Sequence, residues 1–151
     1  MKHIELSLNP LLVNTSFLPK VKNIEIENKQ SDYDILHTYI DSINTHNFES
    51  VQRLLADDAE FIFTDKTCST MESIRSYFNN AWDELLNEKY IATDVNVLKG
   101  ATNTRIFTYK FIYSGINKRG ILIEGCGKAT NVFVNMDGKW KLLHEHLSKF
   151  E

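Results

Sequence analysis

Residues 105–148 read RIFTYKFIYSGINKRGILIEGCGKATNVFVNMDGKWKLLHEHLS, and this stretch decides the fold. Apolar and polar side chains alternate along it, which is typical of β-strands that bury one face. Turn signals at Ser114-Gly115 and Asp137-Gly138 divide the stretch into three runs. We therefore expect long antiparallel strands over residues 105–113, 120–135 and 139–148, with a further strand over 92–98.

The chain before Gly100 has the period of amphipathic helices instead. Ser31 and Asp34 form a capping-box pattern ahead of apolar residues on one helical face, which are Leu36, Tyr39, Ile40 and Ile43. A shorter helix is expected from its cap Asn47 to just before Asp57-Asp58, and it would bury Phe48, Val51, Leu54 and Leu55.

A strand and a third helix follow these two helices. Glu60–Asp65 is rich in aromatic and β-branched residues and predicts a strand. Ser69 and Glu72 form another capping-box pattern, which precedes an apolar stripe of Ile74, Tyr77, Phe78, Ala81, Trp82 and Leu85. Helices first and a glycine-punctuated sheet second predict an α+β domain, in which the helices cover one face of a curved antiparallel sheet.

The composition fits one ordinary globular domain and excludes several classes of protein. With 151 residues, 42% hydrophobic and 25% charged, the chain can bury a core without metal or disulfide support. A formal net charge of -3 and the lack of a long basic run argue against a nucleic-acid partner. No segment has the apolar length of a membrane span or the pattern of a secretion signal, so we expect a cytoplasmic protein without a membrane partner.

Two segments carry a family resemblance, LLADDAEF at residues 54–61 and DGKWKLLHEHLS at residues 137–148. Through them the chain resembles the nuclear transport factor 2-like superfamily, and within it the SnoaL-like branch. The resemblance implies a cone, or cystatin-like α+β roll, in which a long curved antiparallel sheet wraps around about three N-terminal helices. It also implies a pocket at the open end and homodimers formed through the outer sheet face. We divide the chain into an N-terminal extension, residues 1–31, for which the sequence predicts no firm structure, and a SnoaL-like domain, residues 32–151.

Ketosteroid isomerases, which belong to this superfamily, need donors for an enolate oxygen and a carboxylate that moves a proton. Tyr39 matches the tyrosine donor of these enzymes. Phe63 stands at the position of their general base, and Ala129 stands near that of their second donor, a protonated aspartate. Asp65 lies two residues beyond Phe63, on the same face of the predicted strand, and is a candidate for a displaced base.

The association hub of calcium/calmodulin-dependent kinase shares the pattern DGKWxxxHxHxS. That hub lines its pocket with arginines that can hold a carboxylate. Here the matching positions are Phe111, Asn131 and Leu147, so an acidic ligand would lack its charge partners.

Strand alternation and the hub resemblance together predict the side chains of the pocket. The strands supply Tyr109, Phe111, Tyr113, Ala129, Asn131, Phe133, Leu143, Glu145 and Leu147, and the helices add Tyr39, Tyr77, Phe78 and Trp82. Our predicted ligand-binding set is Tyr39, Phe63, Trp82, Tyr109, Phe111, Asn131 and Glu145. An aromatic chamber of this kind suits a small uncharged or cationic organic ligand. The alternative is that the same rings fill a solid core.

Glu145 is the one predicted pocket residue with an ionisable carboxyl group. A carboxyl among apolar neighbours needs a partner or a raised pKa. Glu145 is therefore either a general-base candidate or the partner of a nearby cation, such as Lys128 or Arg105. Glu145 and Asp65 are our candidate catalytic residues.

The opposite face of the last strand is predicted to carry Trp140, Leu142, His144 and His146. His144 and His146 could chelate a metal together with Glu124, but zinc sites need three or four ligands, so we predict no metal and no cofactor. We expect Trp140 and Leu142 to form the centre of a homodimer interface instead.

The sequence supports two hypotheses of function. The first is a SnoaL-like domain that binds a small, largely apolar organic molecule, with acid–base chemistry of isomerase, dehydratase or cyclase type left open. The second is a homodimeric interaction or scaffold module without catalysis, whose core is filled by its own aromatic rings. Whether the protein is an enzyme stays open at this point.

Overall fold

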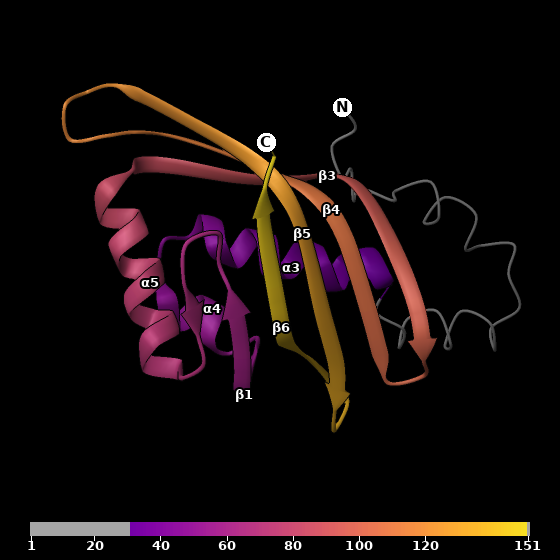
Figure 1. The fold of residues 1–151 in the computed structure, drawn as a ribbon. Coiled ribbons are helices and arrows are strands. Elements are labelled where there is room, and N and C mark those ends of the chain that lie inside the picture. The colour runs from indigo at the N-terminus through magenta and orange to yellow at the C-terminus, as the bar shows by residue number, and fades with distance from the viewer. Residues whose placement is uncertain (1–30, 151) are drawn as a thin grey trace, which may run out of the picture.

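The structure, a computed structural model, describes residues 31–150, in which a curved six-stranded sheet packs against three helices (Figure 1). The helices are α3 (Asp32–Asn44), α4 (Phe48–Gln52) and α5 (Met71–Glu84). The strands are β1 (Leu55–Ile62), β2 (Thr67–Cys68), β3 (Leu86–Ala101), β4 (Thr104–Ile116), β5 (Leu122–Met136) and β6 (Lys139–Lys149). The predicted α+β class and the wrapping of a curved sheet around helices are confirmed. The predicted N-terminal extension lies outside the described residues, apart from Ser31.

The sheet is mixed, because its last strand lies beside its first. Its order is β2-β1-β6-β5-β4-β3, and β3 to β6 form the predicted antiparallel meander. β6 also pairs in parallel with β1, and Figure 1 shows these two strands side by side, pointing the same way. This pairing starts β1 at Leu55, opposite Leu142 and earlier than the predicted Glu60.

The turn predicted at Ser114-Gly115 is wrong, because both residues lie inside β4. The chain reverses at residues 117–120, where the Asn117 side chain accepts hydrogen bonds from the backbone N–H groups of Arg119 and Ile121. Gly115 permits a close approach instead of a turn. A Cβ atom there would lie 3.2 Å from the Cα atom of Glu88.

Polar caps begin the helices, with one shift from the prediction. The first two helices start after their predicted caps. The third is capped by Thr70, one residue after the predicted Ser69. Thr70 and Ser73 each accept a hydrogen bond at 3.1 Å from the other's backbone N–H group, which completes a capping box. Ser73 therefore takes the part that the sequence assigned to Glu72.

A β-bulge in β6 changes which side chains face the helices. The register shifts opposite Val132 and Phe133 of β5, which leaves Leu143 without a partner on that strand. Leu142 is consequently 0% exposed and lies in the core, whereas Leu143 is only half-buried. Trp140 packs against the core too. The predictions that Leu143 faces inward and that Trp140 and Leu142 form an outer patch are both wrong, because period-two alternation breaks at the bulge.

The hydrophobic core fills the space between the helices and the concave face of the sheet. Its largest fully buried side chains include Leu36, Tyr39, Val51, Phe61, Ile74, Phe107, Phe133 and Leu142. The ring of Phe133 meets those of Tyr39 and Phe107 edge to face, at centroid distances of 6.0 and 5.6 Å. These contacts hold α3 against β4 and β5.

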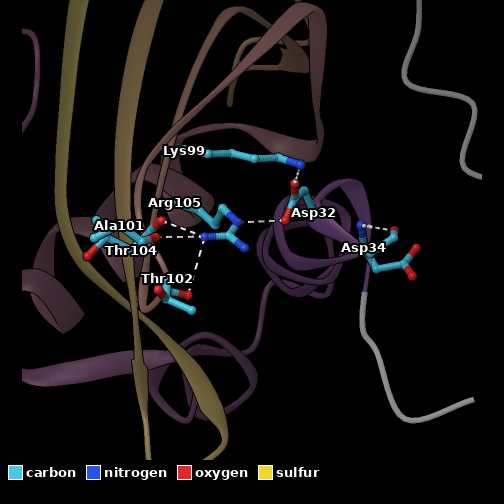
Figure 2. A network of polar contacts seen from close by, with 8 residues as sticks. Asp32, Asp34, Lys99, Ala101, Thr102, Thr104 and Arg105 are labelled. Carbon is cyan, nitrogen blue, oxygen red and sulfur yellow. Dashed lines mark hydrogen bonds and ion pairs between the residues drawn. The ribbon is translucent and has the colours of Figure 1, made fainter. Parts of the chain in front are cut away.

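Arg105 and Asp32 tie the first turn of α3 to the hairpin between β3 and β4 (Figure 2). Arg105 Nε donates to Asp32 Oδ1 at 2.7 Å, and Lys99 Nζ lies 3.0 Å from Asp32 Oδ2. Arg105 Nη1 also donates to the backbone carbonyls of Ala101 and Thr104, at 3.0 and 2.8 Å. Both side chains of the central pair are only 18% exposed, so water screens the pair weakly. Arg105 is thus committed to Asp32 and is not the partner of Glu145.

Replacing Asp32 by Asn should destabilise the fold by about 1–2 kcal/mol, because it removes the charge from two charge-assisted contacts. Asp34→Asn is the matched control, since Asp34 lies in the same first turn of α3 but in none of the ion pairs found among residues 31–150. The control should lose only its interaction with the helix dipole, about 0.5 kcal/mol. Urea denaturation measures both values. Equal losses would show that the Arg105 contacts add nothing to stability.

Candidate functional site

A pocket of about 400 Å³ lies at the end of the cone formed by α5, the starts of β3 and β5 and the ends of β4 and β6. Eight of its lining residues are aromatic, namely Phe63, Tyr77, Phe78, Trp82, Tyr90, Phe111, Tyr113 and Phe150. The cone therefore holds a cavity at this end. A volume of this size suits a small organic ligand.

The predicted ligand-binding residues fall into two groups. Phe63, Trp82, Phe111 and Glu145 line the pocket. Tyr39, Tyr109 and Asn131 are buried and do not line it. Two members of this second group, Tyr39 and Asn131, donate hydrogen bonds to the Glu145 carboxyl.

Glu145 is held by hydrogen bonds to one of its two carboxyl oxygens. Tyr39 Oη donates to Oε1 at 2.7 Å from α3, and Asn131 Nδ2 donates to the same oxygen at 2.9 Å from β5. Neither predicted partner, Lys128 or Arg105, contacts it. Oε2 accepts no hydrogen bond from the described residues, although Glu145 lines the pocket and is 2% exposed. This oxygen is the one available to a ligand.

Burial gives Glu145 the pKa of a group that exchanges protons near neutral pH. It raises the pKa of the carboxyl from 4.5 to about 7, although the hydrogen bonds from Tyr39 and Asn131 lower it. Burial and the charge of Glu145 raise the pKa of Tyr39 well above 10, so its hydroxyl keeps its proton and remains a donor. Glu145 can thus accept a proton as a carboxylate or give one as an acid.

The polar cluster around Glu145 extends further into the core, where its hydrogen bonding is incomplete. The hydroxyls of Tyr90 and Tyr109 and the Oδ1 atom of Asn131 are buried without a partner among residues 31–150. Burial raises the pKa of both tyrosines, and the nearby Glu145 charge raises it further. Tyr90 also lines the pocket. Buried polar atoms without partners are uncommon in folded proteins.

Asp65, the other candidate catalytic residue, is not brought to Glu145. It is exposed in the segment after β1 and does not line the pocket. It accepts a hydrogen bond from Tyr77 Oη at 2.6 Å, and the Tyr77 ring stacks on Phe63 with centroids 3.6 Å apart. Asp65 therefore positions a ring of the pocket wall.

Glu88 is a second carboxyl of the pocket and is not among the residues predicted from the sequence. It is half-buried, and burial raises its pKa from 4.5 to about 7. The predicted strand began only at residue 92, whereas β3 starts at Leu86 with a register shift before Lys89 and a positive φ at Asn87. No period in the sequence gives the direction of a side chain at such an irregular strand start.

Two glycines of β5 make room for the aromatic wall. A Cβ atom at Gly125 would lie 2.4 Å from the Tyr113 ring, and one at Gly127 would lie 2.7 Å from the Phe111 ring. These two rings and that of Tyr90 stack in a nearly parallel row, with interplanar angles of 5° and 10°. The glycines thus let flat aromatic faces lie directly over the strand.

The two histidines of β6 lie on the outer face of the sheet, away from the pocket. His144 Nδ1 is 3.4 Å from Glu60 Oε1 of β1. Across residues 31–150, no three His, Cys, Asp or Glu side chains converge in a way that could hold a metal ion, so His144, His146 and Glu124 do not form the site considered above. In the same part of the chain, no helix is long and apolar enough to cross a membrane.

Comparison with known proteins gives a family match and many structural likenesses. The model of the SnoaL-like domain family matches residues 33–150. Among curated proteins, no sequence matches this chain. A nuclear transport factor 2-like superfamily protein from Salmonella enterica is similar in structure, with a TM-score of 0.71, 12% identity, and coverage of 78% of this chain and 87% of that chain.

Two further structural likenesses concern proteins of different function. A type 2 hexachlorocyclohexane dehydrochlorinase has a TM-score of 0.69 and 16% identity, and the match covers 78% of this chain and 82% of that chain. The association domain of CaMKII from C. elegans has a TM-score of 0.63 and 18% identity, and the match covers 86% of this chain and 97% of that chain. At such identities the likeness establishes the fold alone.

Replacing Glu145 by Gln should remove a pH dependence from the stability. Between pH 4.5 and about 7, folded Glu145 binds more protons than the same residue in the unfolded chain. The free energy of unfolding of the unmodified protein should therefore fall as pH rises through this window, by on the order of 3 kcal/mol from Glu145, and level off above it.

Urea denaturation of both proteins at several pH values measures this effect. Glu88, whose pKa is raised in the same direction, is present in both proteins, so the difference between the two curves reports Glu145. Curves that stay parallel from pH 4.5 to about 7 would show that the Glu145 carboxyl is not held in its protonated form.

Proposed function

The chain belongs to the SnoaL-like domain family, and on that premise we propose that its pocket binds a small, largely apolar organic molecule on which Glu145 acts as an acid–base residue. One observation carries the proposal. The Glu145 carboxyl lines an aromatic pocket with Oε2 free, while Tyr39 and Asn131 hold Oε1.

The arrangement suits proton transfer to and from carbon. The donors on Oε1 fix the carboxyl plane, so Oε2 meets the ligand in one orientation. The aromatic wall keeps water away from the carboxylate, which makes it a stronger base than it would be in solution. This chemistry serves isomerisation, dehydration or cyclisation, and a structural neighbour named as a dehydrochlorinase is compatible with a proton-abstracting site on this fold.

A base-sensitive probe tests the proposal without knowledge of the natural substrate. In 5-nitrobenzisoxazole, a base removes the ring C–H proton as the N–O bond breaks, and the coloured 2-cyano-4-nitrophenolate forms. The protein should accelerate this reaction with a rate that rises with pH to a midpoint near 7, the pKa of Glu145. Glu145→Gln should lower the rate about 100-fold or more.

Asp83→Asn is the matched control, since it neutralises an exposed carboxyl of α5 that does not line the pocket. Its rate should stay within about threefold of that of the unmodified protein. Loss of the rate in Asp65→Asn but not in Glu145→Gln would move the base to Asp65. If the unmodified protein does not accelerate the reaction, the result contradicts acid–base function.

We also propose that the protein forms a homodimer through the outer face of the sheet, as the sequence analysis expects. Leu98, Ile106 and Val132 lie in one row across three neighbouring strands, and Leu98 is 54% exposed. A row of apolar side chains on an open sheet face favours association with another surface. The likeness to an association domain is compatible with this interface.

Val132→Lys should convert such a dimer to a monomer in analytical ultracentrifugation. The charge would lie in the middle of the apolar row, where its burial in an interface is costly. Leu122→Lys is the control, because Leu122 is 60% exposed at the start of β5, away from this row, and the dimer should persist. A monomeric unmodified protein, or a dimer that Val132→Lys leaves intact, would contradict the interface.

A further inference from the structure

The charged side chains that line the pocket are mostly acidic. They are four glutamates, Glu84, Glu88, Glu124 and Glu145, against a single lysine, Lys149. Glu84, Glu124 and Lys149 are exposed at the mouth, whereas Glu88 and Glu145 are withdrawn from solvent. The interior of the pocket is therefore negative whenever these two carboxyls are ionised.

Neither inner carboxyl has a cation of its own among the described residues. Glu88 takes part in no ion pair, and its carboxyl accepts no hydrogen bond there. The nearby His46 ring places Nε2 2.7 Å from the backbone carbonyl oxygen of Glu88, and the same ring stacks on Trp82. Glu145 receives hydrogen bonds from neutral groups only. A buried carboxylate without a counter-charge is costly, so a ligand that supplies the charge would gain from both groups.

The aromatic wall adds a second attraction for positive charge. Tyr90, Phe111 and Tyr113 line the pocket with nearly parallel rings, and Phe63 and Tyr77 line it as a stacked pair. The face of an aromatic ring carries partial negative charge and attracts an ammonium group most strongly where water is excluded. Rings and carboxylates together favour a cation that also has an apolar body.

We infer that the pocket takes an organic cation, an ammonium group on an apolar body, whose charge is balanced by Glu88 and Glu145. The inference rests on the proposed function, since it names the class of molecule bound at the same site. An anion would be repelled by both carboxylates. A neutral ligand would leave them without a counter-charge or require that they stay protonated.

A pair of soluble probes separates charge from shape. Benzyltrimethylammonium carries a fixed positive charge, and N-benzylacetamide is neutral and similar in size. Calorimetric or NMR titration of the full chain at about pH 8.5 should give an affinity for the cation about tenfold higher than for the amide. Lowering the pH to about 5.5 should weaken cation binding alone, because the pocket carboxyls become protonated while the charge of the probe does not change.

Glu88→Gln should lower the affinity for the cation about tenfold and leave that for the amide within about twofold. Asp83→Asn is the matched control, since Asp83 is an exposed acid of α5 outside the pocket lining, and neither affinity should change. The pH titration uses the unmodified protein, so the test stands even where a variant does not fold.

The outcomes distinguish the two proposals. Amide binding equal to or tighter than cation binding would overturn the inference and leave the proposed function standing. Binding of neither probe would count against both. Cation binding that is unchanged in Glu88→Gln and insensitive to pH would place the positive charge outside the pocket and overturn the inference.

Discussion

Leu143 has no partner on β5, and the bulge that it forms in β6 sets which side chains of this strand face the core and which face the pocket. Before it, β6 turns Leu142 toward the helices and closes the core. After it, the strand turns Glu145 inward, toward the pocket. A regular strand of alternating period would have placed these two side chains on opposite faces of the sheet. The bulge therefore lets a single strand complete the hydrophobic core and supply the reactive carboxyl.

Burying that carboxyl costs stability, and residues far apart in the chain reduce the cost. Tyr39 and Asn131 each donate to Oε1 from different elements, α3 and β5. Their donation is not sufficient to keep the pKa of Glu145 at its ordinary value, because desolvation outweighs it. The fold thus buries one carboxyl at a cost in free energy, and the hydrophobic core around it supplies the compensating stability. Such local cost is typical of sites shaped for chemistry rather than for stability.

The sequence predicts the fold well and the site in part. Amphipathic helices, their caps and the long alternating strands follow from local periodicity. The inward direction of Glu145 and Asn131 needs the resemblance to the kinase hub as well, because alternation alone does not say which face is the inner one. The bulge at Leu143 has no local signal, because it depends on pairing with β5. Glu88 lies at an irregular strand start, so its side chain has no period to follow. Arg105 was free to be assigned to Glu145 because a sequence does not show which acid lies within reach in space.

The position of β6 between β1 and β5 has a consequence for how the chain folds. β1 is made early, yet its main neighbour in the sheet is the last strand of the described residues. During synthesis, the edge of β1 that later pairs with β6 therefore stays unpaired while three long strands, β3 to β5, are made. Contacts between such distant segments form slowly, and an open apolar strand invites pairing with other chains. Until β6 is in place, this protein is most vulnerable to aggregation at β1.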